Sequence, residues 1–479
     1  MRPPAPPRAP PRLPVGRPDH RPGPARLGNV LPASPVVTQS MSAFVPPLVV
    51  AADMGYGHLR AAWPLAHALA TEVVAADGAD LAGEDERRLW ARTRRFYELT
   101  TRLSQGRLLG APMQALVTAF TAIPHLHPHR DLSRPTLGVR QLDRLVDGGL
   151  GRGLCERLRR EGRALVTTFY APAIAAGRAG LPRVFMVVTD SDVNRIWAPF
   201  APGETRIRFL VPSERAALRL RAYGVPAARV SVTGFPLPGE LLGGPDLPVL
   251  KSNLAARLAR LDPRGAFRLE HREAIARALG CAPEAEDRRP PHLVFAVGGA
   301  GAQVGLARRF LPGVREEIER GRLRVTLVSG VRREVAAAFR DAVRAAGLAM
   351  GGGVDILEAA GHADYFLRFH ALLAQADILW TKPSEMTFFA ALGLPLICAP
   401  PVGIHEAYNR RWAVEAGAGL AQRDPRYAGH WIDEWLADGT LAAAAWSGFT
   451  RLPKRGLYRI LEEVGASPSG EVAGAARAG

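Results

Sequence analysis

Short apolar runs alternate with longer amphipathic stretches along most of the chain from Val45 onward. The runs that we expect to form strands lie at 48–52, 72–75, 164–168, 183–188, 208–211 and 230–233, and then at 293–297, 324–328, 354–357, 377–380 and 394–398. Short runs that are apolar throughout are typical of parallel strands, because helices cover both faces of such a sheet. The pattern therefore predicts an α/β fold with two Rossmann-like domains that face each other across a cleft.

The two sets of strands also indicate where the domains begin and end. We expect an N-terminal domain at 45–235, a linker with a decorating helix at 236–290, a C-terminal domain at 291–440 and a helical segment at 441–466. Residues 84–161 should be mostly helical apart from a Pro- and His-rich loop near 124–135. Ser213 should cap a helix that ends at Tyr223 and Gly224, since Ser favours helix starts and Gly favours helix ends.

The residues at both ends of the chain are too poor in large apolar side chains to form a hydrophobic core. Residues 1–40 hold 12 of the 41 prolines and six arginines, with Asp19 as the one acid. This predicts a disordered tail over 1–44, which lacks the apolar stretch of a secretory signal. Met41 is an alternative start of translation, because the first strand follows it closely. The Gly-, Ala- and Ser-rich residues 467–479 are predicted to be disordered as well.

Composition excludes several broad classes of protein. Apolar residues make up 47% of the chain and charged residues 22%, which is the balance of a globular protein. No uninterrupted apolar stretch reaches the roughly 18 residues of an ordinary membrane-spanning helix. The three cysteines, Cys155, Cys281 and Cys398, are far apart and have no metal-ligand spacing, so we expect a reducing, cytoplasmic location.

The net charge of +17 first suggests a nucleic-acid or membrane partner. However, 59 of the 62 basic residues are arginine, in a chain that is also rich in Ala, Gly and Pro, which is the bias that GC-rich codons produce. No run of five basic residues and no nucleic-acid-binding motif occurs. Nucleic acid is therefore not an expected partner.

Two glycine-rich turns stand where a strand should give way to a helix. The first contains Gly55, Tyr56, Gly57 and His58, directly after the first expected strand. Glycine permits a sharp turn close to a ligand, and a histidine at the carboxyl edge of a sheet can take a proton from an acceptor hydroxyl. The second turn comprises residues 298–303, and its N–H groups suit a diphosphate, although no Walker A lysine follows. Ordinary strand–helix turns would look the same in both places.

A third cluster lies between the last two expected strands and just beyond them. It contains Lys382, one of only three lysines, with Ser384 and Glu385, and it is followed by His405, Glu406 and Asn409. These positions should lie at the carboxyl ends of the second set of strands, where α/β proteins bind ligands. A solvated surface lysine is the alternative interpretation of Lys382.

These segments together resemble monogalactosyldiacylglycerol synthases and processive diacylglycerol glucosyltransferases. The lipid-intermediate N-acetylglucosaminyltransferase of peptidoglycan synthesis is a more distant relative. The similarity covers about 46–420, and its segments are 53–61, 188–190 with Trp197, 211–214, 223–226, 232–236, 381–383, 393–397, His405, Glu406, Asn409 and 417–419.

The resemblance implies a GT-B fold and an inverting glycosyl transfer that needs neither a metal ion nor another cofactor. It implies that the N-terminal domain binds the acceptor, a lipid or small molecule, often at a membrane surface, and that 441–466 cross back to that domain. It assigns His58 as the catalytic base or acceptor-orienting residue, with Asp190 as the rival, and Gly55, Tyr56 and Gly57 to the acceptor-side loop. The C-terminal domain would bind a nucleotide-sugar, usually a UDP-sugar. The expected donor-binding residues are Gly298, Gly299, Gly301, Ala302, Gln303, Lys382, Ser384, Glu385, His405, Glu406 and Asn409.

The chain also departs from this family. The family's nucleotide-binding glutamate is Ala390 here, a histidine that follows Thr-Asp is Asn194, and His405 replaces a glutamine. Glu385 is positioned to substitute for the missing glutamate from the preceding turn. Three functions therefore stay open: a glycosyltransferase, a nucleotide-sugar-binding protein without turnover, and a nucleotide-sugar epimerase.

Overall fold

The computed structural model describes residues 45–52, 56–93, 122–280, 289–297 and 303–466. The predicted tails at 1–44 and 467–479 lie outside the described residues. The elements that follow all belong to the unit that begins at Val45.

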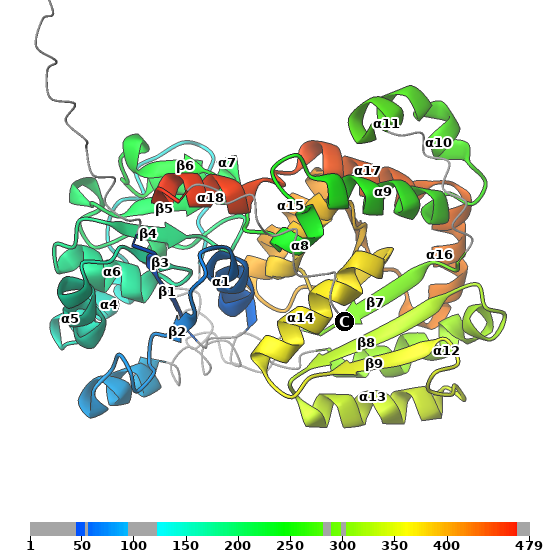
Figure 1. Cartoon of the computed structure of the whole chain (residues 1–479), viewed down its shortest axis with the longest axis horizontal. Coiled ribbons are helices and arrows are strands. Elements are labelled where there is room, and N and C mark those ends of the chain that lie inside the picture. Colours follow the sequence, from blue (N-terminus) through cyan, green and yellow to red (C-terminus); the bar gives the residue numbers. More distant parts are fainter. Residues whose placement is uncertain (1–44, 53–55, 94–121, 281–288, 298–302, 467–479) are drawn as a thin grey trace, which may run out of the picture. The chain divides into compact units, whose positions relative to one another are not determined.

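The first half forms a six-stranded parallel sheet in the order β2-β1-β3-β4-β5-β6 (Figure 1). Its strands are β1 (Leu48–Ala51), β2 (Val73–Ala75), β3 (Leu165–Thr167), β4 (Val184–Val187), β5 (Arg208–Val211) and β6 (Val230–Val232). Each strand lies within the run that predicted it. The order reverses between β1 and β3, which are hydrogen-bonded neighbours in the register Val50↔Thr167. The carboxyl end of such a reversal point is where α/β sheets bind ligands.

Helices connect these parallel strands. They are α1 (Tyr56–Ala68), a helix over 84–93, α4 (Leu137–Asp147), α5 (Arg152–Glu161), α6 (Tyr170–Arg178) and α7 (Glu214–Ala222), with single turns η1 (Arg195–Trp197), η2 (Pro202–Glu204) and η3 (Ala227–Arg229). Ser213 caps α7 as predicted, because its hydroxyl accepts a hydrogen bond from the Ala216 N–H at 3.1 Å. The expected loop near 124–135 is present, whereas 94–121 lie outside the described residues.

The second half forms another six-stranded parallel sheet, in the order β12-β11-β10-β7-β8-β9. Its strands are β7 (His292–Ala296), β8 (Arg324–Gly330), β9 (Val354–Glu358), β10 (Ile378–Thr381), β11 (Leu396–Cys398) and β12 (Gly419–Ala421). The sequence did not predict β12, because Gly-Leu-Ala offers no apolar run and the strand exists only by pairing with β11. The two sheets confirm the predicted α/β fold class with two Rossmann-like domains.

The connections of the second half are also mainly helical. They are α8 (Gly239–Leu242), α9 (Pro248–Leu261), α10 (Ala266–Glu270), α11 (Arg272–Leu279), α12 (Val304–Glu319), α13 (Arg333–Ala345), α14 (His362–Gln375), α15 (Ile404–Glu415), α16 (Ala428–Ala437), α17 (Thr440–Arg451) and α18 (Gly456–Val464), with η4 (Glu385–Leu392) and η5 (Pro425–Tyr427). Figure 1 shows α13 and α14 on opposite faces of this sheet. Both faces are therefore covered, which explains why the residues of its central strands are mostly apolar and buried.

Helix α9 is part of the second core, not the decoration that the sequence suggested. Leu250, Leu254 and Leu258 follow one another at intervals of four residues and are fully buried. Arg257 is buried beside them and donates to the Ala376 and Leu392 carbonyls at 2.9 and 2.8 Å. This spacing of leucines marks a buried face of the helix.

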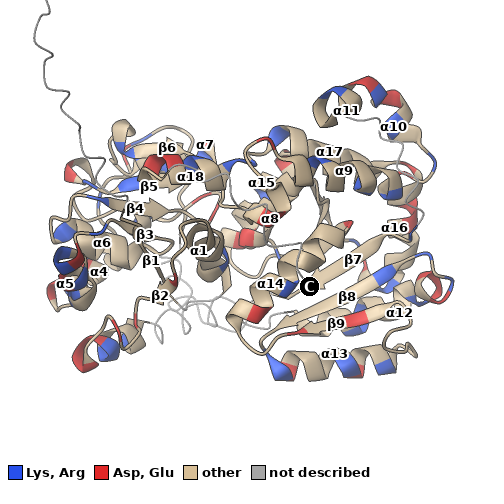
Figure 2. Ribbon diagram, in the orientation of Figure 1, with Lys and Arg blue, Asp and Glu red and all other residues tan. Residues whose placement is uncertain are grey.

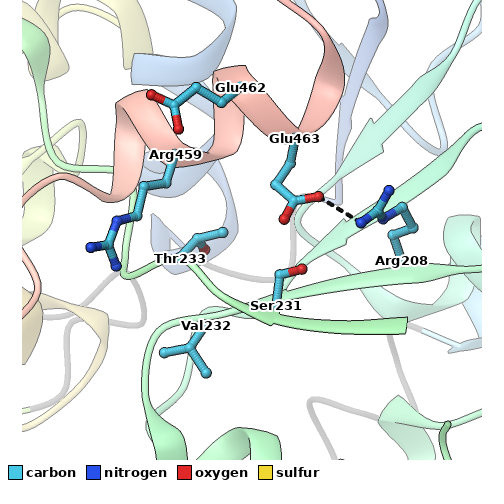
Figure 3. A pocket seen from close by; sticks show the side chains of 7 residues that line it. All are labelled: Arg208, Ser231, Val232, Thr233, Arg459, Glu462 and Glu463. Carbon is cyan, nitrogen blue, oxygen red and sulfur yellow. Dashed lines mark ion pairs between the residues drawn. The ribbon is translucent and has the colours of Figure 1, made fainter. Parts of the chain in front are cut away.

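The C-terminal helix α18 packs against the first sheet although it follows the second in sequence. Glu463 forms an ion pair with Arg208 of β5 at 2.9 Å. Gly456 makes the return possible, because a Cβ there would lie only 2.1 Å from the carbonyl oxygen of Phe235. An open polar hollow of about 500 Å³ lies beside this contact (Figure 3), lined by Arg208, Ser231, Val232, Thr233, Arg459, Glu462 and Glu463.

Basic and acidic side chains are interspersed along α5 and around α10 and α11 (Figure 2). Many of these charges form exposed pairs, such as Arg88 with Glu84 and Arg315 with Glu319. Exposed pairs of this kind contribute little stability. Among the described residues, no helix is long and apolar enough to cross a membrane.

Candidate functional site

The carboxyl edge of the first sheet holds His58 at the point where the strand order reverses. His58 lies in the first turn of α1, after β1, and its Nδ1 is 2.7 Å from the Thr168 carbonyl oxygen, just beyond β3. A carbonyl only accepts hydrogen bonds, so Nδ1 carries the proton and Nε2 presents its lone pair. The Thr168 hydroxyl in turn donates to the His58 carbonyl at 3.0 Å. Two hydrogen bonds thus fix both the ring and its backbone.

The surroundings of His58 favour the neutral imidazole in the resting protein. Burial lowers the pKa of His58 below its usual value, while the charge of Asp190 and the Thr168 carbonyl oppose this shift. Phe169 and Trp197 form the apolar walls, with ring centroids 5.0 and 6.3 Å from the imidazole. A neutral histidine beside a carboxylate can accept a proton and have the resulting charge stabilised.

The carboxyl edge of the second sheet brings Lys382 and Glu406 together. Lys382 follows β10, and its ammonium forms an ion pair with the carboxylate of Glu406 in the first turn of α15. Glu406 also accepts a hydrogen bond from the Val402 N–H at 2.7 Å. The Lys382 side chain is 17% exposed, which rules out the solvated surface lysine that the sequence left open.

Three other predicted donor residues lie on the segments that leave this edge. The Gln303 amide donates to the Pro400 carbonyl at 2.6 Å, which connects the start of α12 to the segment after β11. Ser384 Oγ and His405 Nδ1 are buried atoms that have no hydrogen-bond partner among the described residues. Buried polar atoms are usually satisfied, so both are available to a bound polar ligand.

Asn409 contacts the first half of the chain, not the space beside Lys382. This residue of α15 is fully buried, and its carbonyl oxygen accepts hydrogen bonds from the Ser191 N–H at 2.9 Å and the Ser191 hydroxyl at 2.7 Å. Its amide nitrogen donates to Asp190 at 3.0 Å. One side chain of the second half therefore holds the turn that carries Asp190, on which His58 depends electrostatically.

Glu385 also contacts the first half. Its carboxylate forms an ion pair with Arg60 of α1, whose side chain is 1% exposed. Tyr56, predicted on the acceptor side, faces the second half too, because its hydroxyl accepts a hydrogen bond from the Val331 N–H at 3.2 Å. The backbone of Gly57 also lies close to Glu385, since a Cβ on residue 57 would be 2.9 Å from a carboxylate oxygen of that side chain.

The remaining predicted site residues, Gly55, Gly298, Gly299, Gly301 and Ala302, lie outside the described residues. Sequence reasoning missed Thr168, Ser191 and Arg60. Thr168 could have been found, because it is the last residue of a predicted strand and so lies at the edge that also carries His58. Within the described ranges, no group of three His, Cys, Asp or Glu side chains could hold a metal ion.

Comparison with known proteins places this chain in no family. No family model and no curated protein matches this chain. Among solved structures, UDP-GlcNAc 2-epimerase from Neisseria meningitidis bound to UDP-GlcNAc is 12% identical, with a TM-score of 0.45 over 87% of this chain and 98% of its own. MurG of Acinetobacter baumannii is 13% identical, with a TM-score of 0.44 over 88% and 99%. The calicheamicin glycosyltransferase CalG4 is 12% identical, with a TM-score of 0.44 over 88% and 98%. Such low identities assign no activity to this chain.

Proposed function

We propose that this chain is an inverting glycosyltransferase that moves a sugar from a nucleotide-sugar, with a UDP-sugar favoured, to a hydroxyl of a lipid or small molecule. The observation that carries the proposal is the state of His58. Its Nδ1 proton is engaged by Thr168, burial lowers its pKa, and the negative charge of Asp190 opposes that shift by favouring the imidazolium. This combination suits a group that accepts one proton during reaction.

In the proposed reaction, the first half of the chain binds the acceptor and the second half binds the donor. His58 Nε2 accepts the proton of the acceptor hydroxyl while that oxygen attacks the anomeric carbon of the donor sugar. The bond from the anomeric carbon to the nucleotide diphosphate breaks, and the diphosphate leaves with the electron pair. Attack opposite the leaving group inverts the anomeric centre. Asp190 then stabilises the imidazolium without taking its proton.

On the donor side, Lys382 supplies a positive charge for the diphosphate as negative charge develops on it. Ser384 Oγ and His405 Nδ1 offer further polar contacts, because both are buried without partners among the described residues. Glu406 holds Lys382 in place through their ion pair. We include the glycine-rich segment 298–302 among the residues that bind the donor diphosphate because of its sequence alone.

A thermal-shift screen against nucleotide-sugars and free nucleotides tests donor binding first. A ligand present at 100 times its dissociation constant stabilises the folded state by about 2.7 kcal/mol, which is readily measured. We expect stabilisation by UDP and by at least one UDP-sugar. If no nucleotide-sugar stabilises the protein, the proposal is contradicted.

A second candidate function is nucleotide-sugar binding without turnover. It is favoured by Ala390, which is fully buried in η4 where the resembled family has its nucleotide-binding glutamate, and by the engagement of Glu385 with Arg60. Residue 390 thus offers no carboxylate for a ribose, and the carboxylate of Glu385 is already paired. Binding without transfer or hydrolysis, across lipid and small-molecule acceptors, would favour this second function.

A further inference from the structure

The first turn of α1 lies between the two halves of the chain and carries functional groups on opposite faces. Residues two positions apart on a helix point about 200° apart. His58 accordingly faces Thr168 in the first half, while Arg60 faces Glu385 and Tyr365 in the second. Any displacement of the Arg60 face would therefore also move the imidazole.

Arg60 is enclosed by aromatic side chains and held by two polar partners. One terminal guanidinium nitrogen pairs with the Glu385 carboxylate, and the other terminal nitrogen donates to the Tyr365 hydroxyl at 2.6 Å. The rings of Tyr56, Tyr365 and Phe369 lie 5.9, 5.7 and 5.3 Å from the guanidinium carbon. A buried, doubly held arginine fixes geometry well, because the planar guanidinium has few alternative arrangements.

The second-half partner of Arg60 lies in the turn that carries the candidate donor residues. Glu385 directly follows Ser384 and lies three residues after Lys382. Its side chain is 11% exposed, so leaving it without Arg60 would strand a nearly buried charge. The ion pair thus ties the donor turn directly to the helix of the candidate base.

We propose that Arg60 and Glu385 are positioning residues that fix the His58 imidazole relative to the donor turn 382–385. This proposal rests on the proposed glycosyltransferase function and changes the expected role of Glu385, from a ligand of the donor to a support of the base.

The test is a double-mutant cycle with Arg60→Met, Glu385→Gln and the double variant. Each single variant should lower kcat by about 10²-fold, the usual loss when a reacting group is misplaced by about 1 Å. The dissociation constant of the nucleotide-sugar should change less than about 3-fold, since neither residue contacts the donor. The double variant should lose about 10²-fold and not the roughly 10⁴-fold of independent effects, because the two residues act as one unit. Arg88→Met and Glu84→Gln, at an exposed pair, are the matched controls and should leave kcat unchanged.

A second readout does not depend on turnover. The imidazole ¹⁵N signals of His58, assigned by their loss in His58→Gln, should shift in both single variants and stay unchanged in the controls. Unmoved signals would overturn the positioning role, as would losses that multiply in the double variant. The positioning role would also be contradicted if Glu385→Gln weakened nucleotide-sugar binding tenfold or more at unchanged kcat, because Glu385 would then be a donor ligand. If the wild-type protein transfers no sugar, the glycosyltransferase proposal fails, and the His58 signals alone decide whether Arg60 and Glu385 position the ring.

Discussion

The carboxyl edges of the two sheets differ in how their titratable side chains are partnered. At the first edge, the His58 ring uses one nitrogen for the Thr168 carbonyl and keeps the Nε2 lone pair for a substrate. At the second edge, the charged side chains are already paired. Lys382 forms an ion pair with Glu406, and Glu385 forms one with Arg60 of the first half. In the proposed reaction, the first edge is therefore prepared for proton transfer before any ligand arrives, whereas a donor would have to share Lys382 with an existing partner.

The largest expected effect comes from removing the prepared base. His58→Ala should lower kcat by about 10²–10⁴-fold, the usual contribution of positioned acid–base catalysis, with little change in donor affinity. His67→Ala, an exposed histidine in the last turn of the same helix, is the control. Steady-state kinetics and calorimetric donor binding would separate the two effects. If His58→Ala is as active as the wild type, Asp190 becomes the candidate base.

The next effect concerns the second edge. Lys382→Met should weaken nucleotide-sugar binding by about 10- to 100-fold, since a charge-assisted hydrogen bond contributes roughly 1.5–3 kcal/mol. Titration calorimetry with UDP measures this loss directly, and Lys251→Met on α9 is the matched control. Unchanged affinity in Lys382→Met would show that Glu406 keeps the ammonium away from the donor.

The hydrogen bonds of Asn409 join the second half of the chain to the turn that carries Asp190, and a substitution can remove them. Asn409→Leu removes the hydrogen-bond partner of the Ser191 N–H and of Asp190, so it should cost about 1–3 kcal/mol in unfolding free energy. Chemical denaturation measures this loss, and Asn253→Leu on α9 is the control. The same variant should also lower kcat, because the turn that carries Asp190 is no longer held. Full stability of Asn409→Leu would mean that the two edges are not joined at this point.

A smaller effect concerns how the free energy of unfolding depends on pH. His292 begins β7, at the opposite end of the second sheet from Lys382, and burial lowers its pKa to about 4. Between pH 6.5 and pH 4 the unfolded chain binds this proton more readily than the folded one, so stability falls as the pH falls. The loss should reach about 2 kcal/mol at pH 5 and be reduced in His292→Gln, as thermal unfolding at several pH values would show. A loss of equal size in His292→Gln would assign it to other groups.

The strands and the edge positions could be predicted from the sequence, whereas most of the contacts between the two halves could not. The buried runs around β1 and β7 are local features, and a residue that directly follows such a strand must lie at its carboxyl edge. His58 and Lys382 were found in this way. The partners of Asn409 and Glu385 were not found, because Arg60 and Glu385 are 325 positions apart and arginine is so common in this chain that no single one stands out. Strand β12 was missed because pairing with β11, and not its own residues, makes it a strand.

The central claim is that His58 serves an inverting transfer from a nucleotide-sugar. Proton NMR of the wild-type protein, incubated with the nucleotide-sugar found by thermal shift and with a panel of diacylglycerols and small alcohols, tests it most directly. The account predicts that the anomeric signal of the donor disappears while free nucleotide diphosphate accumulates, together with a glycoside of the opposite anomeric configuration, and that His58→Ala slows all three changes. A glycoside of retained configuration would contradict the claim. So would a new nucleotide-sugar with an altered ring stereocentre, which is the product of an epimerase, or a donor that binds and stays intact.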